Sequence, residues 1–155
     1  MTDARASGSL GAADIDAASL IVHASCVAFD GKGILILGPS GSGKSSLALQ
    51  LMAMGAELVA DDKTKVHAVN AGILASSPAA IKGMIEARGV GILMASALKE
   101  ASIQLIVDLG RKEQDRLPQK QEFSLLGQSI PLLCKVDAAH FPAAILQFIK
   151  GGRGA

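Results

Sequence analysis

The sequence predicts an α/β domain with a mixed β-sheet and few helices, and three observations support this fold class. A chain of 155 residues suits one domain with a single hydrophobic core. Short runs rich in leucine, isoleucine and valine follow one another, several of them without an intervening helical segment. One run leads directly into a glycine-rich phosphate-binding loop. We therefore expect a sheet that is not regularly doubly wound.

The N-terminal part is expected to contain a mobile leader, two strands and a helix. Residues 1–18 are mostly Ala, Gly, Ser and Asp without an apolar period, which is typical of a flexible segment. SLIVHASCVAFD (19–30) and GILILG (33–38) are strand candidates separated by a DGKG turn. KSSLALQLMAMG (44–55) is predicted to be a helix, with leucines at helical spacing and Gly55 as its C-cap.

Strands predominate in the remaining sequence. AELVADD (56–62) is a strand that ends in two carboxylates, and TKVHAVN with AGILA (64–75) is a hairpin that turns near Asn70. SSPAAIKGMIEARG (76–89) is predicted to be a short helix with Ser77 as its N-cap. The later elements are expected to be the strands GVGILMA and SIQLIVDLG, the strand pair EFSLLGQSIPLLCKVD and the closing helix FPAAILQFIK. The domain would span residues 19–150, with a disordered tail at 151–155.

Composition excludes several classes of partner. The 15 Lys and Arg residues balance 14 Asp and Glu residues, and four Phe without Trp or Tyr offer few stacking platforms, so no nucleic-acid partner is expected. No apolar run approaches the ~20 residues of a bilayer span, and no secretory signal is present, so we expect a cytoplasmic protein without a membrane partner. The two cysteines, Cys26 and Cys134, are expected to be buried reduced thiols.

The loop identifies a nucleotide site. Residues 38–45 fit the pattern G-x-x-x-x-G-K-[ST], between a predicted strand and a predicted helix. The expected ligands are ATP and Mg²⁺: Lys44 would pair with the β- and γ-phosphates, and the Ser45 hydroxyl would bind the metal. The nucleotide-binding residues would be Gly38, Pro39, Ser40, Gly41, Ser42, Gly43, Lys44, Ser45 and Ser46.

Asp61 and Asp62 close the strand that follows the helix. A carboxylate there can hold Mg²⁺ or accept a proton from the attacking group. Because adjacent residues of an extended strand point to opposite faces, only one of the two is expected to face the nucleotide. The sequence alone also allows both carboxylates to be solvated turn residues.

The segments GPSGSGKSSLAL, GAELVADD and IEARGVGI resemble, in this order, the C-terminal catalytic domain of the HPr kinase/phosphorylases. His23 in IVHASCV and the triplet Asp115-Arg116-Leu117 match further family positions, and the resemblance spans roughly residues 20–137. It implies a P-loop domain of the HPr kinase/phosphoenolpyruvate carboxykinase type. The chain would be a compact form consisting of the catalytic domain only. Ser46 departs from the family, which commonly has an acidic residue there.

The resemblance implies an ATP-dependent kinase that phosphorylates a serine of the phosphocarrier protein HPr and regulates the phosphotransferase system. The reverse reaction, in which inorganic phosphate releases pyrophosphate from phosphoserine, is also known in the family. Longer relatives form hexamers, so a homo-oligomer is expected. A nucleotide-binding sensor without transfer activity and a small-molecule P-loop kinase are the alternatives.

The resemblance also assigns roles to individual residues. Asp61 would be the acid/base, and His23 would orient it. Asp62 and Glu86 would lie near the metal with Ser45. Arg88 would be a cation near the transferred phosphoryl group, and Arg116 would serve mainly the phosphorolysis direction.

Overall fold

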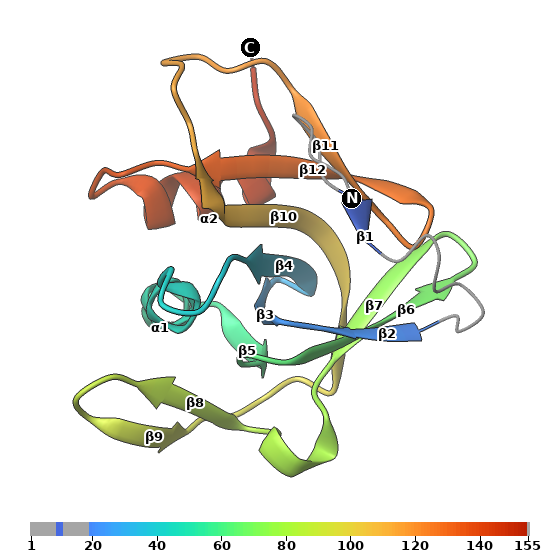
Figure 1. Ribbon diagram of the computed structural model, residues 1–155, viewed down its shortest axis with the longest axis vertical. Coiled ribbons are helices and arrows are strands. Elements are labelled where there is room, and N and C mark those ends of the chain that lie inside the picture. Colours follow the sequence, from blue (N-terminus) through green and yellow to red (C-terminus); the bar gives the residue numbers. More distant parts are fainter. Residues whose placement is uncertain (1–8, 11–18, 155) are drawn as a thin grey trace.

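The computed structural model describes residues 9–10 and 19–154 (Figure 1). Within these residues the helices are α1 (Lys44–Ala53) and α2 (Phe141–Gly151), and a 3-10 turn lies at Ala79–Ile81. The strands are β1 (Ser9–Leu10), β2 (Ser19–Val22), β3 (Ala24–Phe29), β4 (Lys32–Leu37), β5 (Glu57–Ala60), β6 (Thr64–Val69), β7 (Gly72–Ser76), β8 (Met84–Ala87), β9 (Gly91–Met94), β10 (Glu100–Lys112), β11 (Gln121–Leu125) and β12 (Gln128–Lys135).

The main sheet is mixed, as the sequence predicts. Its order is β1-β11-β12-β10-β4-β3-β5, with β4, β10 and β12 parallel to one another and β3 antiparallel to both of its neighbours. β2, β6 and β7 extend the sheet through the antiparallel pairing of β7 with the first residues of β10. β10 bends sharply between these two parts, which curls the sheet (Figure 1). The β8–β9 hairpin forms a separate two-stranded sheet.

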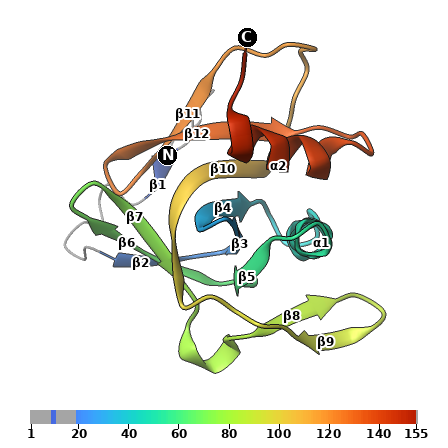
Figure 2. The same ribbon diagram turned by 180° about the vertical axis from the view of Figure 1, so that it is seen from behind.

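The central strands are buried on both faces. In β4, Ile34 and Ile36 pack in a core that contains both helices, whereas Leu35 and Leu37 pack in a second core against the β6–β7 side. This alternation follows from the two-residue period of a strand, and it explains why the strand reads as the continuous apolar run ILIL. Helix α1 contacts both α2 and β8, so it lies between the closing helix and the β8–β9 hairpin (Figures 1 and 2).

Helix α1 ends as predicted at a glycine. The Gly55 amide donates to the Met52 carbonyl (3.1 Å) and the Ala56 amide to the Leu51 carbonyl (3.0 Å), which is the hydrogen-bond pattern of a Schellman motif. Gly55 has φ = 112°, a conformation that few side-chain-bearing residues adopt. This turn directs the chain back into β5, which carries the two aspartates to the sheet edge near the loop.

The predicted helix at 76–89 is wrong, and the predicted strand at 19–30 is divided. Residues 79–81 form one 3-10 turn, Gly83 has φ = 76°, and β8 follows with Ile85 buried between more exposed neighbours. Ser77 and the proline after it suggested the start of a helix, but the chain makes only the 3-10 turn there before it enters β8. The 19–30 segment divides at His23, because β2 pairs with β6 while β3 pairs with β4 and β5.

The chain termini add two short features to the sheet and helices. Within the predicted leader, residues 9–10 form β1, parallel to β11, and the rest of the leader lies outside the described residues. At the other end, α2 extends to Gly151, and the Arg153 guanidinium donates to the Pro118 carbonyl. No helix in the described ranges is both long and apolar enough to cross a bilayer.

Both cysteines are reduced and buried, as expected. Burial raises the pKa of the Cys26 thiol to about 12, and burial also raises the pKa of Cys134. Because the thiolate is the reactive form, both thiols are held in the unreactive state near neutral pH.

We predict that Cys26 resists alkylation by iodoacetamide at pH 8 in the folded protein and reacts readily in guanidinium chloride. The difference in rate should exceed about 100-fold, because the raised pKa and the burial both suppress attack. Mass spectrometry of tryptic peptides after timed quenching measures this rate separately from that of Cys134. Equal rates in the folded and unfolded protein would contradict the burial of β3.

A second prediction concerns the packing of α1. Leu51→Ala removes a fully buried side chain from the core that contains both helices, and it should lower the free energy of unfolding by about 2–5 kcal/mol. Met54→Ala, at a side chain that is 44% exposed next to the end of the same helix, should cost less than about 1 kcal/mol. Urea denaturation followed by circular dichroism measures both values. Similar losses for the two variants would show that the packing of α1 is not as described.

Candidate functional site

The phosphate-binding loop connects β4 to α1 in an open cradle. Gly38 has φ = 151°, and a Cβ there would come within 2.4 Å of the Ser42 hydroxyl oxygen, so only glycine fits. Gly43 caps the helix with φ = 100°, and neither a capping side chain nor an acidic residue occupies the first turn. The first amides of α1 are therefore available to an anion, which the helix dipole also favours.

Lys44 lies across this loop. Its side chain is buried, and its ammonium group donates to the carbonyls of Gly38 (2.8 Å) and Pro39 (3.2 Å). The charge is thus held at the loop by main-chain oxygens, where a bound phosphate would compete for its hydrogen bonds. This placement agrees with the role predicted for Lys44 in binding the β- and γ-phosphates.

Asp61 ties the loop to the neighbouring strands. Its Oδ1 accepts hydrogen bonds from the hydroxyls of Ser45 (2.6 Å) and Ser25 (2.8 Å), and its Oδ2 accepts one from the amide of Glu86 (3.0 Å). The carboxylate is buried, with 7% of the residue exposed. Asp61 therefore joins α1, β3 and β8, and the hydroxyl it holds is that of the predicted metal ligand.

Asp62 has a different environment. The His23 Nε2 atom lies 2.7 Å from its Oδ1, and the side chains are 48% and 59% exposed, respectively. The backbone of Asp62 is left-handed (φ = 66°), and its amide donates to the Ser25 hydroxyl (3.1 Å). The prediction that His23 orients Asp61 is therefore wrong, because the histidine contacts the next residue.

Only one of the two aspartates, Asp62, lines the cavity, in agreement with the prediction that one of them faces the nucleotide, but strand alternation is not the reason. Asp61 contacts Ser45 of the loop, while Asp62 lines the same cavity as the loop residues. The alternation of a strand does not apply because β5 ends at Ala60 and Asp62 turns into the left-handed region. Backbone strain of this kind is found most often at functional sites.

The cavity beside the loop has a volume of about 630 Å³. Glu86 and Arg88 reach it from β8 and from the turn before β9, where both residues are exposed. The hairpin thus supplies one carboxylate and one guanidinium opposite the loop. The complete lining is Ser40, Gly41, Gly43, Lys44, Ser45, Ser46, Leu49, Asp62, Glu86, Ala87 and Arg88.

These residues fit a polyphosphate with Mg²⁺. Amides, an ammonium and a guanidinium surround the cavity, and the available oxygen ligands are the Ser45 hydroxyl and nearby carboxylates. Within the described part of the chain, no three His, Cys, Asp or Glu side chains form a metal-binding group. Mg²⁺ commonly takes one or two protein ligands together with phosphate oxygens and water, so it does not require such a group.

Several predicted site residues do not line this cavity, among them Gly38 and Pro39, which line neither of the two cavities beside the loop, and one buried residue of the site was not predicted. Arg116 is exposed in the segment between β10 and β11 and does not line this cavity. Ser42 lines a different cavity on the other side of the loop. Ser25 was not predicted, although its buried hydroxyl bonds both aspartates. A serine within the otherwise apolar strand ASCVAF was the available signal, since a buried hydroxyl needs a partner.

The sequence of this chain is similar to those of known proteins. The family described as HPr Serine kinase C-terminal domain matches residues 16–143. The HPr kinase/phosphorylase of Streptococcus thermophilus is 40% identical over 123 residues, which cover 71% of this chain and 40% of the relative. The HPr kinase/phosphorylase of Clostridium acetobutylicum is 37% identical over 102 residues, covering 61% and 34%, respectively. The matched segments thus account for about a third to two fifths of these relatives.

The fold is shared with a solved structure. The HPr(Ser) kinase/phosphatase from Coxiella burnetii superposes with a TM-score of 0.72 at 22% sequence identity, and the match covers 84% of this chain and 88% of the other. This likeness confirms the predicted fold class. Since the family match spans most of the sequence and contains the loop, both aspartates and the β8–β9 hairpin, the chain belongs to the HPr serine kinase C-terminal domain family.

Proposed function

We propose that this domain transfers the γ-phosphoryl group of ATP to a serine hydroxyl of an HPr-type phosphocarrier protein. The observation that carries the proposal is the Asp62 carboxylate, which lines the cavity beside the phosphate-binding loop and is paired with His23. A nucleotide sensor needs the loop but has no use for an exposed carboxylate supported by a histidine. The family membership supports the choice of an HPr-type protein as the acceptor.

Asp62 is the proposed proton acceptor. A serine hydroxyl is a weak nucleophile, so a carboxylate positioned to take its proton assists attack on the γ-phosphorus. Asp62 is exposed to an incoming protein, whereas Asp61 is buried and accepts three hydrogen bonds. His23 holds the Asp62 carboxylate through its Nε2 atom. In the reverse reaction Asp62 would return the proton to the leaving serine oxygen.

Asp61 and Ser45 are proposed to form the Mg²⁺ site, with Glu86 near it. The metal, when bound, neutralises charge on the β- and γ-phosphates. Asp61 orients the Ser45 hydroxyl through the 2.6 Å hydrogen bond between them. Lys44 and Arg88 place positive charge on two sides of the cavity, where the transferred oxygens would lie.

The substrate and the reaction type can be tested together. Incubation with γ-labelled ATP, Mg²⁺ and an HPr-type protein should give acid-stable label on a serine of the acceptor, and omission of Mg²⁺ should abolish it. Lys44→Ala should reduce labelling by about 100-fold or more, because a phosphate-positioning cation is lost. ATP binding without labelled acceptor would establish the sensor instead, and label on a small molecule would establish a small-molecule kinase.

The assignment of the two aspartates makes a separate prediction. Asp62→Asn should lower kcat by about 10²–10⁴-fold at saturating Mg²⁺ and leave ATP binding intact, because only proton transfer is removed. Asp61→Asn should instead raise the Mg²⁺ concentration required for half-maximal activity, since it disturbs the Ser45 hydroxyl. Steady-state kinetics across a Mg²⁺ titration separate the two effects. The roles are reversed if Asp61→Asn shows the kcat defect and Asp62→Asn the Mg²⁺ dependence.

A further inference from the structure

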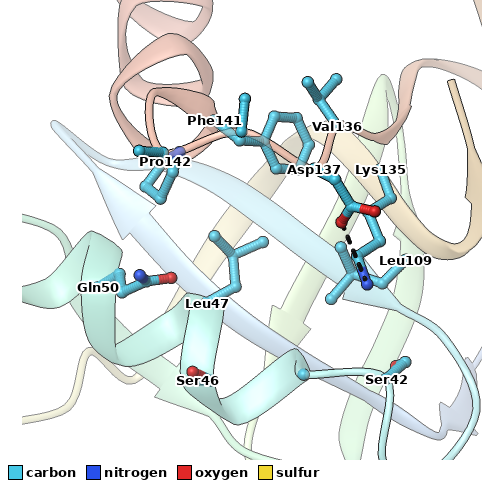
Figure 3. A pocket seen from close by; sticks show the side chains of 13 residues that line it. Ser42, Ser46, Leu47, Gln50, Leu109, Lys135, Val136, Asp137, Phe141 and Pro142 are labelled. Atoms are coloured by element: carbon cyan, nitrogen blue, oxygen red, sulfur yellow. Dashed lines mark ion pairs between the residues drawn. The ribbon is translucent and has the colours of Figure 1, made fainter.

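A second cavity, of about 400 Å³, lies between α1 and the segment that joins β12 to α2 (Figure 3). In Figure 3, Ser46, Leu47 and Gln50 of α1 form one side, and Asp137, Phe141 and Pro142 lie opposite. Pockets of this size hold small molecules. The proposed phosphoryl-transfer chemistry, which lies around Asp62 and Arg88, makes no use of this cavity.

The second cavity borders the phosphate-binding loop. Gly43 and Ser46 line both cavities, so the turn of chain that opens α1 separates them. The order of the sheet explains this arrangement. The loop follows β4, the aspartates follow β5 on one side of it, and β10 and β12 lie on the other side, where Leu109 and Lys135 line the second cavity.

We propose that the second cavity binds the nucleoside portion of the nucleoside triphosphate, an inference that rests on the proposed kinase function. The reacting γ-phosphoryl group must lie beside Asp62 in the first cavity. The rest of the triphosphate then extends over the amides of the loop. The nucleoside emerges on the opposite side of Gly43 and Ser46, which is where the second cavity begins.

The walls suit a flat heterocycle. Leu47 and Leu109 are buried side chains that present apolar surface to the cavity, and Phe141 and Pro142 at the start of α2 close it from above (Figure 3). Apolar walls with a few polar groups are typical of small-molecule sites. Gln50 is exposed and lines the cavity, where its amide can both donate and accept hydrogen bonds. These groups can bind a nucleobase by its face and by one edge.

The charged residues on the side of the second cavity near the loop can bind the ribose and the α-phosphate of the nucleotide. The Asp137 carboxylate lies 2.8 Å from the Lys112 ammonium and 3.7 Å from that of Lys135, and the hydrogen bond from Lys112 lowers the pKa of Asp137. Because the contact with Lys135 is longer than a hydrogen bond, that ammonium can turn toward a phosphate. Asp137 remains an acceptor for ribose hydroxyls.

The test compares ATP with tripolyphosphate, which has the phosphates but no nucleoside. Ala139 is an exposed residue that lines the cavity, so Ala139→Trp should fill the cavity without disturbing the loop. Isothermal titration calorimetry in the presence of Mg²⁺ should show ATP affinity reduced by about tenfold or more, which corresponds to at least about 1.4 kcal/mol. Tripolyphosphate affinity should not change.

Two further variants complete the design. Ala144→Trp places the same side chain at an exposed position of α2 outside the cavity lining, and it should leave both affinities unchanged. Ala138→Trp, at the neighbouring lining position, should repeat the effect of Ala139→Trp. If either Ala139→Trp or Ala138→Trp does not fold, which circular dichroism reports, the other variant provides the measurement.

Each outcome has a distinct meaning. Unchanged ATP affinity in the occluding variants overturns the nucleoside site and leaves the kinase proposal standing. An equal loss for ATP and tripolyphosphate also overturns it, because the effect would then arise at the loop. If the unmodified protein binds neither compound, the proposed kinase function itself is wrong. Selective loss of ATP affinity supports the nucleoside site.

Discussion

The hydrogen bonds accepted by the Asp61 carboxylate hold the site together. The carboxylate is buried, and its oxygens accept hydrogen bonds from Ser25, Ser45 and the Glu86 amide. These partners belong to a sheet strand, the helix that follows the phosphate-binding loop, and the β8–β9 hairpin. One side chain thus fixes the relative positions of three elements that surround the cavity. A buried carboxylate requires such complete hydrogen bonding, so the arrangement has little freedom to change.

The hydrogen bonds of Asp61 also explain why the neighbouring Asp62 is exposed. Asp61 is directed inward by its three partners, and the left-handed backbone at Asp62 then turns the next side chain toward solvent and His23. The Ser25 hydroxyl stabilises both orientations, since it donates to Asp61 and accepts from the Asp62 amide. Two adjacent residues with the same side chain consequently have different chemistry. Asp61 is buried and joins three elements of the site, whereas Asp62 is exposed and lines the cavity.

The sheet order divides the surroundings of the loop. The two aspartates and the β8–β9 hairpin, with Glu86 and Arg88, lie on the β5 side, and a more apolar cavity lies on the side of β10 and β12. Helix α1 contacts elements of both sides, namely β8 and α2. A molecule with a charged tail and a flat apolar end therefore finds a matching environment along the loop. This division arises because β4 is a central strand with a parallel neighbour on one side and an antiparallel neighbour on the other.

The sequence was enough to predict the loop, helix α1 and its terminal Gly55, the β6–β7 hairpin and the mixed sheet, because each depends on local residue patterns. It did not determine that residues 84–87 form a strand, since Ser77 and the proline after it suggested the start of a helix and only the pairing of β8 with β9 decides the matter. Nor could it assign the two aspartates or identify Ser25. His23 and Asp62 are 39 positions apart, and Ser25 and Asp61 are 36 apart. Contacts over such separations are set by how β3 pairs with β5, so the tertiary structure alone decided which carboxylate is buried and which is exposed.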